Sequence, residues 1–154
     1  MASILRLKIV DNSEVRTEIE KHIELVGQVE LAQWAISAAL HVLHFLDTEF
    51  PNNDTIANGV RVNEVWQKGD TTVHQVRQAG FKIHEVARKC KSESAKASAR
   101  AAGHAVSVGH MREHAILATD YAIKAIGLAY HNDMDSITQE RRWQLTELLR
   151  HIPL

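Results

Sequence analysis

The chain has 154 residues, of which 45% are hydrophobic and 24% charged, and its formal net charge at pH 7 is −1. This length suits one domain with its own hydrophobic core. The near-zero charge argues against a nucleic-acid protein that gains its affinity by neutralising phosphates. Cys90 is the only cysteine, which excludes an internal disulfide and favours a reducing compartment.

The segment before residue 13 is expected to be an extended arm. Residues 3–10 alternate like a β-strand, but no other segment matches them as a partner strand. They therefore form either an extended arm or a strand that pairs with the same segment of a second copy, which would make a homodimer. The first ten residues lack a signal-peptide pattern, and the longest uncharged stretch, 31–46, is too short to cross a membrane. We expect a cytoplasmic protein without membrane contact.

The remainder, 13–154, is predicted to be an all-helical domain, because prolines are few and alanines abundant. Turn and capping residues divide it into helices at about 14–26, 29–50, 55–67, 72–90, 92–109, 112–130 and 135–150. Asp11, Asn12 or Ser13 would cap the first helix and Asp54 the third. Thr72 would cap the fourth helix, Ser92 or Ser94 the fifth, and Asp135 or Ser136 the last. The fold class is all-α: a single compact bundle of six to seven helices with a short N-terminal arm or strand.

The segment from Ser92 to Gly109 is almost free of large side chains. Twelve of its eighteen residues are Ala, Gly or Ser, so it is stable as a helix only where neighbouring helices come close and bury it. Arg100 and His104 lie within it, and two more histidines follow directly. Buried polar groups without partners cost about 1–3 kcal/mol each, so we expect these side chains to contact one another.

A metal site is one interpretation of the histidines. The segment His110-Met111-Arg112-Glu113-His114 matches the H-x-x-E-H pattern of inverted zinc peptidases, provided that it lies on one continuous helix. A site built from His84, His110 and His114 on different helices would suit zinc, nickel or iron. The alternative, which we favour, is that the rings satisfy one another, backbone carbonyls or Asp120. We expect no cofactor.

An anion pocket is a second interpretation. A basic pocket for an anion such as phosphate or carboxylate would be formed by Arg77, His84, Arg88 and Arg100. The alternative is a solvated helix face with ordinary ion pairs to Glu85 or Glu93.

The spacing of these residues also resembles a known family. The pattern Gly103-His104-Ala105-Val106, then His110-x-x-x-His114-Ala115, then Tyr121-Ala122-x-Lys124-Ala125, is similar to the immunity-five-like family of putative immunity proteins from bacterial polymorphic toxin systems. Leu31-Ala32-x-Trp34-Ala35 and Arg77 with His84-x-x-Ala87-Arg88 fit it too. The resemblance spans roughly residues 28–130. It departs at Met111-Arg112, where the family pattern has a helix-starting proline.

The resemblance implies a non-enzymatic, all-helical protein that binds and neutralises a cognate toxin. Its characteristic residues here would be Arg77, His84, Arg100, His110, His114 and Tyr121. Together with the residues singled out above, the candidate binding set is Arg77, His84, Arg88, Arg100, His104, His110, His114 and Tyr121. The competing hypothesis is a small helix bundle with a His-based metal or anion site that is hydrolase-like or has a sensing role.

Overall fold

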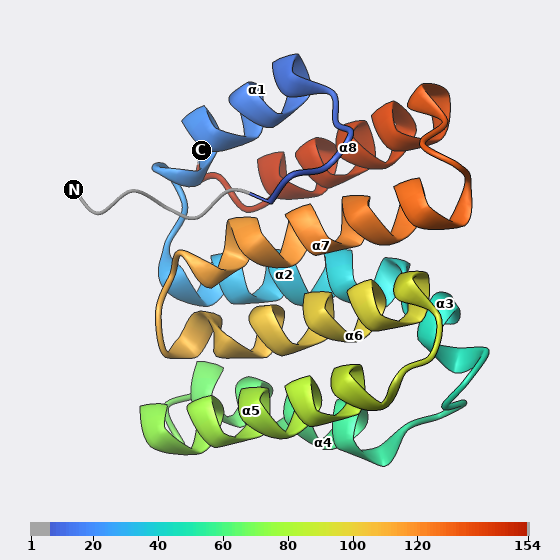
Figure 1. Cartoon of the computed structure of the whole chain (residues 1–154). Helices are drawn as coiled ribbons and strands as arrows, with labels where there is room; N and C mark the ends of the chain where they lie inside the picture. Colours follow the sequence, from blue (N-terminus) through green and yellow to red (C-terminus); the bar gives the residue numbers. More distant parts are fainter. Residues whose placement is uncertain (1–6, 154) are drawn as a thin grey trace.

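The computed structural model describes residues 7–153, which form eight α-helices, one short 3-10 helix and, within that range, no strand (Figure 1). The elements are α1 (Ser13–Ile23), α2 (Gln28–His41), α3 (His44–Asp47), α4 (Asp54–Gln67), α5 (Val73–Lys89), α6 (Glu93–Val106), η1 (Ser107–Gly109), α7 (His114–Ala129) and α8 (Met134–Leu149). The predicted all-α class is confirmed. Within residues 7–153, no helix combines the length and the apolar composition that crossing a bilayer requires.

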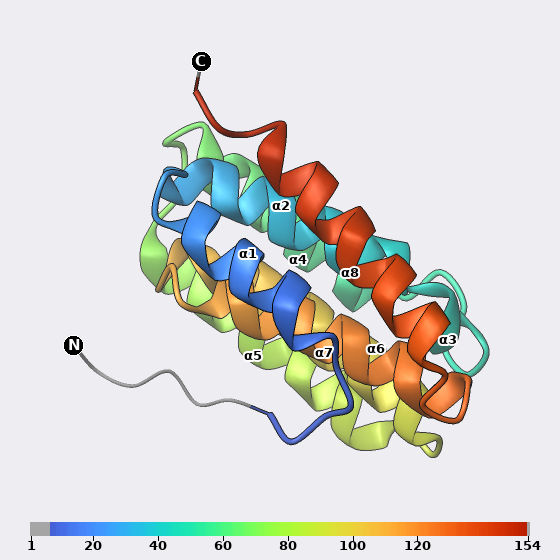
Figure 2. The same cartoon turned by 90° about the horizontal axis from the view of Figure 1, so that it is seen from above.

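The helices form two layers. α5, α6 and α7 lie side by side in one layer, and α4, α2 and α8 lie behind them (Figures 1 and 2). α1 packs against α8 at one edge of the structure. Trp34 on α2 is fully buried, and its Nε1–H donates to the backbone carbonyl of Gln144 on α8 at 2.8 Å.

Small residues bring α5 and α6 very close together, as the sequence predicts. A Cβ atom added at Gly80 would collide with Ser107 Oγ and would lie 3.3 Å from the carbonyl oxygen of Gly103. A Cβ added at Gly103 would lie 2.7 Å from Cε1 of His84. Burying alanine faces at such short separations gains dispersion contacts that compensate for the small side chains.

The helix predicted over 29–50 is interrupted. α2 ends at His41 and α3 begins at His44, because Val42 and Leu43 bond three residues back along the chain instead of four. The carbonyl of Val42 also accepts a buried hydrogen bond of 2.9 Å from Ser98 Oγ on α6. This contact anchors the break against the neighbouring helix.

Several helix starts also differ from the prediction. Asn53 caps α4 in place of Asp54, and Asp133 caps α8 in place of Asp135 or Ser136. Asp133 accepts hydrogen bonds from both the backbone N–H and the hydroxyl of Ser136. Asp133 therefore completes the cap before Asp135 is reached. Thr72 caps α5, Ser92 caps α6 and Asn12 caps α1, as predicted.

The N-terminal prediction is tested only in part. Residues 7–12 lead into α1 without regular secondary structure, whereas residues 1–6 lie outside the described part of the chain. The strand predicted over 3–10 therefore finds no support in residues 7–10. The homodimer that it would form stays a prediction.

A buried ion network joins this arm to three helices. Asp120 on α7 accepts bonds from Arg16 of α1, at 3.0 and 2.7 Å, and from Arg141 of α8, at 2.6 Å. Arg141 is fully buried and also donates two bonds to Asp11, at 2.8 and 2.7 Å. Asp120 is thus the partner of two arginines, and of the alternatives given for the histidines the structure does not show the one in which they pair with Asp120.

Candidate functional site

Five of the predicted residues contact one another across three helices. His84 comes from α5, Arg100 and His104 from α6, and His114 and Tyr121 from α7; we call them the histidine cluster. Of residues 97–109, only Arg100 and His104 are not buried. Their spacing of four residues places both on the one strip of this helix that neighbouring helices leave open.

Two side-chain hydrogen bonds hold the cluster. Nη1 of Arg100 lies 2.8 Å from Nδ1 of His84, and Nδ1 of His104 lies 2.9 Å from Nδ1 of His114. The His104 ring stacks on Tyr121 with an interplanar angle of 10° and meets the His84 ring edge-on. The prediction that the rings satisfy one another is therefore confirmed for His104 and His114.

The contacts define where the protons are. A guanidinium only donates, so Nδ1 of His84 accepts and its ring proton lies on Nε2. Between His104 and His114, one Nδ1 donates and the other accepts. At least two of the three rings are therefore neutral in this arrangement.

Burial and neighbouring positive charge keep the rings neutral. Desolvation, followed by the charges of Arg100, His114 and Arg88, lowers the pKa of His84 to about 4. Desolvation and the adjacent His84, His114 and Arg100 lower the pKa of His104 to about 3. The pKa of His114 is lowered as well, mainly by burial and by His110, while Glu113 opposes the shift.

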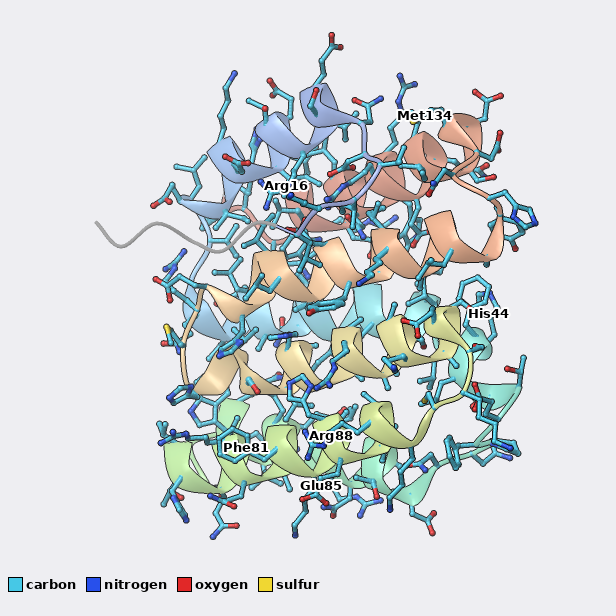
Figure 3. The ribbon with its side chains drawn as sticks, in the orientation of Figure 1. Arg16, His44, Phe81, Glu85, Arg88 and Met134 are labelled. Atoms are coloured by element: carbon cyan, nitrogen blue, oxygen red, sulfur yellow. The ribbon has the colours of Figure 1, made fainter. Side chains whose placement is uncertain are left out.

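Four cationic side chains on the helices that form the cluster make no ion pair with a carboxylate within residues 7–153: Arg77, Arg88, Arg100 and Lys124. Lys124 lies over the Tyr121 ring, with Nζ 5.8 Å from its centre, and Arg77 lies over Phe81 at 5.3 Å. Figure 3 shows Arg88 on the side of α5 nearer to α6 and Glu85 on the far side. The ion pairs to Glu85 or Glu93, which were the alternative to an anion pocket, do not form within residues 7–153, where Glu93 pairs with Lys96 at 3.5 Å.

The remaining predicted residues lie at the margin. The His110 ring is centred 5.8 Å from that of His114, in the connection between η1 and α7. Arg77 and Arg88 are exposed on α5. Within the described residues, neither side chain forms a hydrogen bond with the cluster.

The metal interpretation gains no geometric support. α7 begins at His114, so the H-x-x-E-H segment does not lie on one continuous helix, and the condition for the zinc-peptidase interpretation is not met. No group of three or more His, Cys, Asp or Glu side chains within residues 7–153 is placed to hold a metal ion. Nδ1 of His84 and Nδ1 of His114 are already committed to Arg100 and His104.

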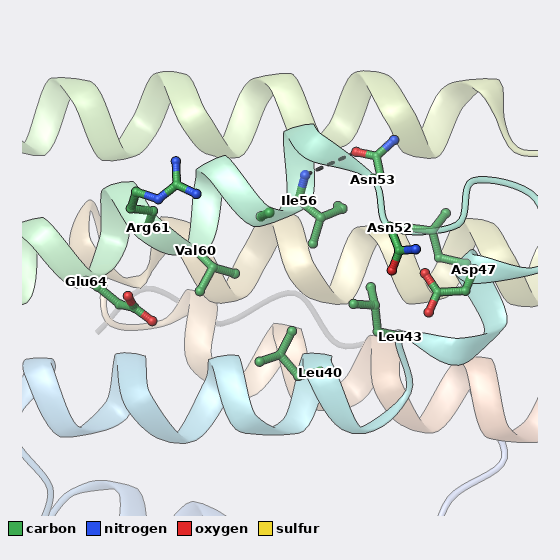
Figure 4. A pocket seen from close by; sticks show the side chains of 11 residues that line it. Leu40, Leu43, Asp47, Asn52, Asn53, Ile56, Val60, Arg61 and Glu64 are labelled. Carbon is green, nitrogen blue, oxygen red and sulfur yellow. Dashed lines mark hydrogen bonds between the residues drawn. The ribbon is translucent and has the colours of Figure 1, made fainter.

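Sequence reasoning missed Lys124 as part of the site, although the residue stands in the family pattern. It also missed a groove of about 460 Å³ between α2–α3 and α4, lined by apolar side chains such as Leu40, Ile56 and Val60 with Arg61 and Glu64 at its rim (Figure 4). None of the candidate site residues lines that groove. The groove and the histidine cluster are thus separate features.

The chain was compared with known families and proteins. The family model described as "Imm-5 like putative immunity protein" matches residues 21–151, which include all eight candidate residues and every helix from α2 to α8. The comparisons with curated proteins and with solved structures gave no match. The match covers more than four-fifths of the sequence and extends beyond the region 28–130 that carries the resemblance. The chain therefore belongs to the family of Imm-5 like putative immunity proteins.

Proposed function

We propose that this protein binds a cognate bacterial toxin and neutralises it without enzymatic turnover. Membership of an immunity family supports the proposal. The observation that carries it further is the histidine cluster, in which neutral rings are bonded to one another and to Arg100. These bonds occupy Nδ1 of all three rings within the cluster, so the rings hold one another in a fixed arrangement.

The surface around the cluster has the composition of a binding face. We define the cationic face as Arg77, Phe81, His84, Arg88, Arg100, His104, His114, Tyr121 and Lys124, contributed by α5, α6 and α7. Arg and Tyr are over-represented among the residues that dominate the energy of protein interfaces. Phe81 is 48% exposed although it is a large apolar side chain.

The rings at the centre of this face are held in place before any partner arrives. Stacking on Tyr121 and the bond to His114 fix His104, and tight packing on Gly103 fixes His84. Side chains that are already ordered lose little rotamer entropy on binding, so more of the contact energy appears as affinity.

Co-expression with the toxin encoded beside this protein's gene tests the proposal. We expect cells that produce the toxin to grow when this protein is also produced, and to die when it is not. A toxin from an unrelated system serves as the specificity control and should kill in both cases. Equal killing by the adjacent toxin with and without this protein would contradict the proposed function.

A further inference from the structure

Arg100 makes little use of its hydrogen-bonding capacity inside the fold. A guanidinium carries five N–H donors. Within the described residues, one bond leaves this side chain, to the neutral acceptor Nδ1 of His84 at 2.8 Å. The side chain is half-buried, so part of it remains accessible to a partner.

The charges around Arg100 are unbalanced. The groups that act electrostatically on the His84 and His104 rings are Arg88, Arg100 and other histidines. A carboxylate, that of Glu113, acts only on the third ring, His114. The ion pairs found in residues 7–153 involve neither Arg77, Arg88, Arg100 nor Lys124. Four cations thus share one face of a protein whose overall formal charge is −1.

The His84 ring, which accepts the hydrogen bond from Arg100, is fixed by packing. The His84 ring lies against Gly103, where an added Cβ would be 2.7 Å from Cε1 and 2.8 Å from Nε2. His84 therefore engages Nη1 of Arg100, and the remaining N–H donors of this half-buried guanidinium form no hydrogen bond within the described residues. The planar fork of an arginine edge matches a carboxylate with two parallel bonds.

We propose that Arg100 anchors a carboxylate of the toxin, with Arg88 and Lys124 as flanking cations, so that the toxin surface docking on the cationic face is acidic. This inference rests on the proposed function and specifies the chemistry of its partner. Complementary charge of this kind speeds association and selects the partner. The exposed Phe81 beside Arg77 offers apolar contact next to the charges, which suits a protein surface better than a small free anion.

Binding of the purified toxin, in a form inactivated in its own catalytic site, tests the inference. We expect Arg100→Gln to weaken binding about 10- to 100-fold, the loss for a charge-assisted bond. Arg88→Glu and Lys124→Glu should weaken it as well, and higher salt should reduce the difference between the parent and the variants. Arg142→Glu, an exposed charge reversal on α8, is the matched control and should bind like the parent.

The outcomes separate the two proposals. If the parent protein does not bind the toxin, the proposed function fails. If the parent binds and Arg88→Glu, Lys124→Glu and Arg100→Gln all bind equally well, the function stands and the acidic partner surface is wrong. The first two variants decide the matter if Arg100→Gln does not fold, because neither residue makes a side-chain hydrogen bond within residues 7–153.

Free anions provide a second readout. The side-chain NMR resonances of Arg100 and His84 can be followed while inorganic phosphate, a short oligoglutamate peptide or a single-stranded oligonucleotide is added. We expect the oligoglutamate peptide to shift both resonances and to compete with the toxin. Competition by phosphate or the oligonucleotide at lower concentration than by the peptide would overturn the assignment of an acidic protein surface.

Discussion

Nδ1 of His104 lies 2.9 Å from Nδ1 of His114, so one ring donates a hydrogen bond that the other accepts. This bond joins α6 to α7 at the surface of the histidine cluster and exists only while one of the two rings can accept. Protonating the acceptor would leave two donors facing each other. The cluster is therefore a pH-sensitive element of the fold.

Stability should fall as the pH drops below the pKa of a free histidine. Folding lowers the pKa of His84 to about 4 and of His104 to about 3, from an ordinary value of 6.5. Between about pH 6.5 and 4 the unfolded chain takes up protons that the folded rings do not, so it is favoured by acid. The free energy of unfolding should decrease by up to about 1.4 kcal/mol per pH unit for each ring in this window, and these rings should contribute no slope above it. Urea denaturation from pH 4.5 to 7.5 measures the effect.

A substitution pair assigns that slope to the cluster. His104→Gln removes one of the rings and should make the slope shallower. His74→Gln changes an exposed histidine of α5 outside the cluster and should leave the slope of the parent. An identical slope in all three proteins would show that the cluster does not govern the acid response.

Asp120→Asn should be strongly destabilising. The carboxylate accepts bonds from Arg16 and Arg141, and it is 1% exposed. Removing its charge leaves the two buried guanidinium groups with less compensation, a situation that costs about 3–5 kcal/mol. Chemical denaturation at neutral pH gives the value.

The exposed pair Glu18–Lys21 supplies the comparison, with an N–O distance of 3.2 Å. Glu18→Gln should cost less than about 1 kcal/mol, because water screens such pairs. If Asp120→Asn proved as mild as Glu18→Gln, the network would not hold α1, α7 and α8 together.

Gly103→Ala should displace the His84 ring. The new methyl group would lie 2.7 Å from Cε1, and overpacking of this kind costs about 1–3 kcal/mol. The bond between Arg100 and His84 should weaken at the same time. In a His84→Ala background the same glycine substitution should cost much less, because the obstructing ring is gone. A thermal denaturation cycle over the four proteins measures this coupling, and equal costs in both backgrounds would contradict the close contact.

Local sequence pattern predicted most of the helices because their caps are local. Thr72 and Ser92 each bond the backbone N–H three residues later, and those spacings are visible in the sequence. The break after His41 was not predicted, because it involves Ser98, fifty-six residues away in the chain. A contact between residues so far apart in the chain produces no periodic pattern in the sequence.

The difference between local and long-range contacts also explains which features of the site were predicted and which were missed. Histidines set among alanines indicate polar contacts, and His104 and His114 do meet. Asp120 stands out in the sequence as an acid within an apolar helix. Its partners Arg16 and Arg141 are 104 and 21 residues away along the chain. Composition alone therefore does not show whether Asp120 pairs with an arginine or with a histidine. The partners of Asp120 depend on which side of α7 faces α1 and α8.

The most direct test of the account is a titration of the toxin's activity with this protein at a fixed toxin concentration well above the dissociation constant. The account predicts a linear loss of activity that ends at one protein per toxin, and a shallow, incomplete loss with Arg88→Glu and Lys124→Glu combined. Full inhibition at far below one equivalent would mean turnover, and no inhibition at large excess would mean that this protein does not neutralise that toxin.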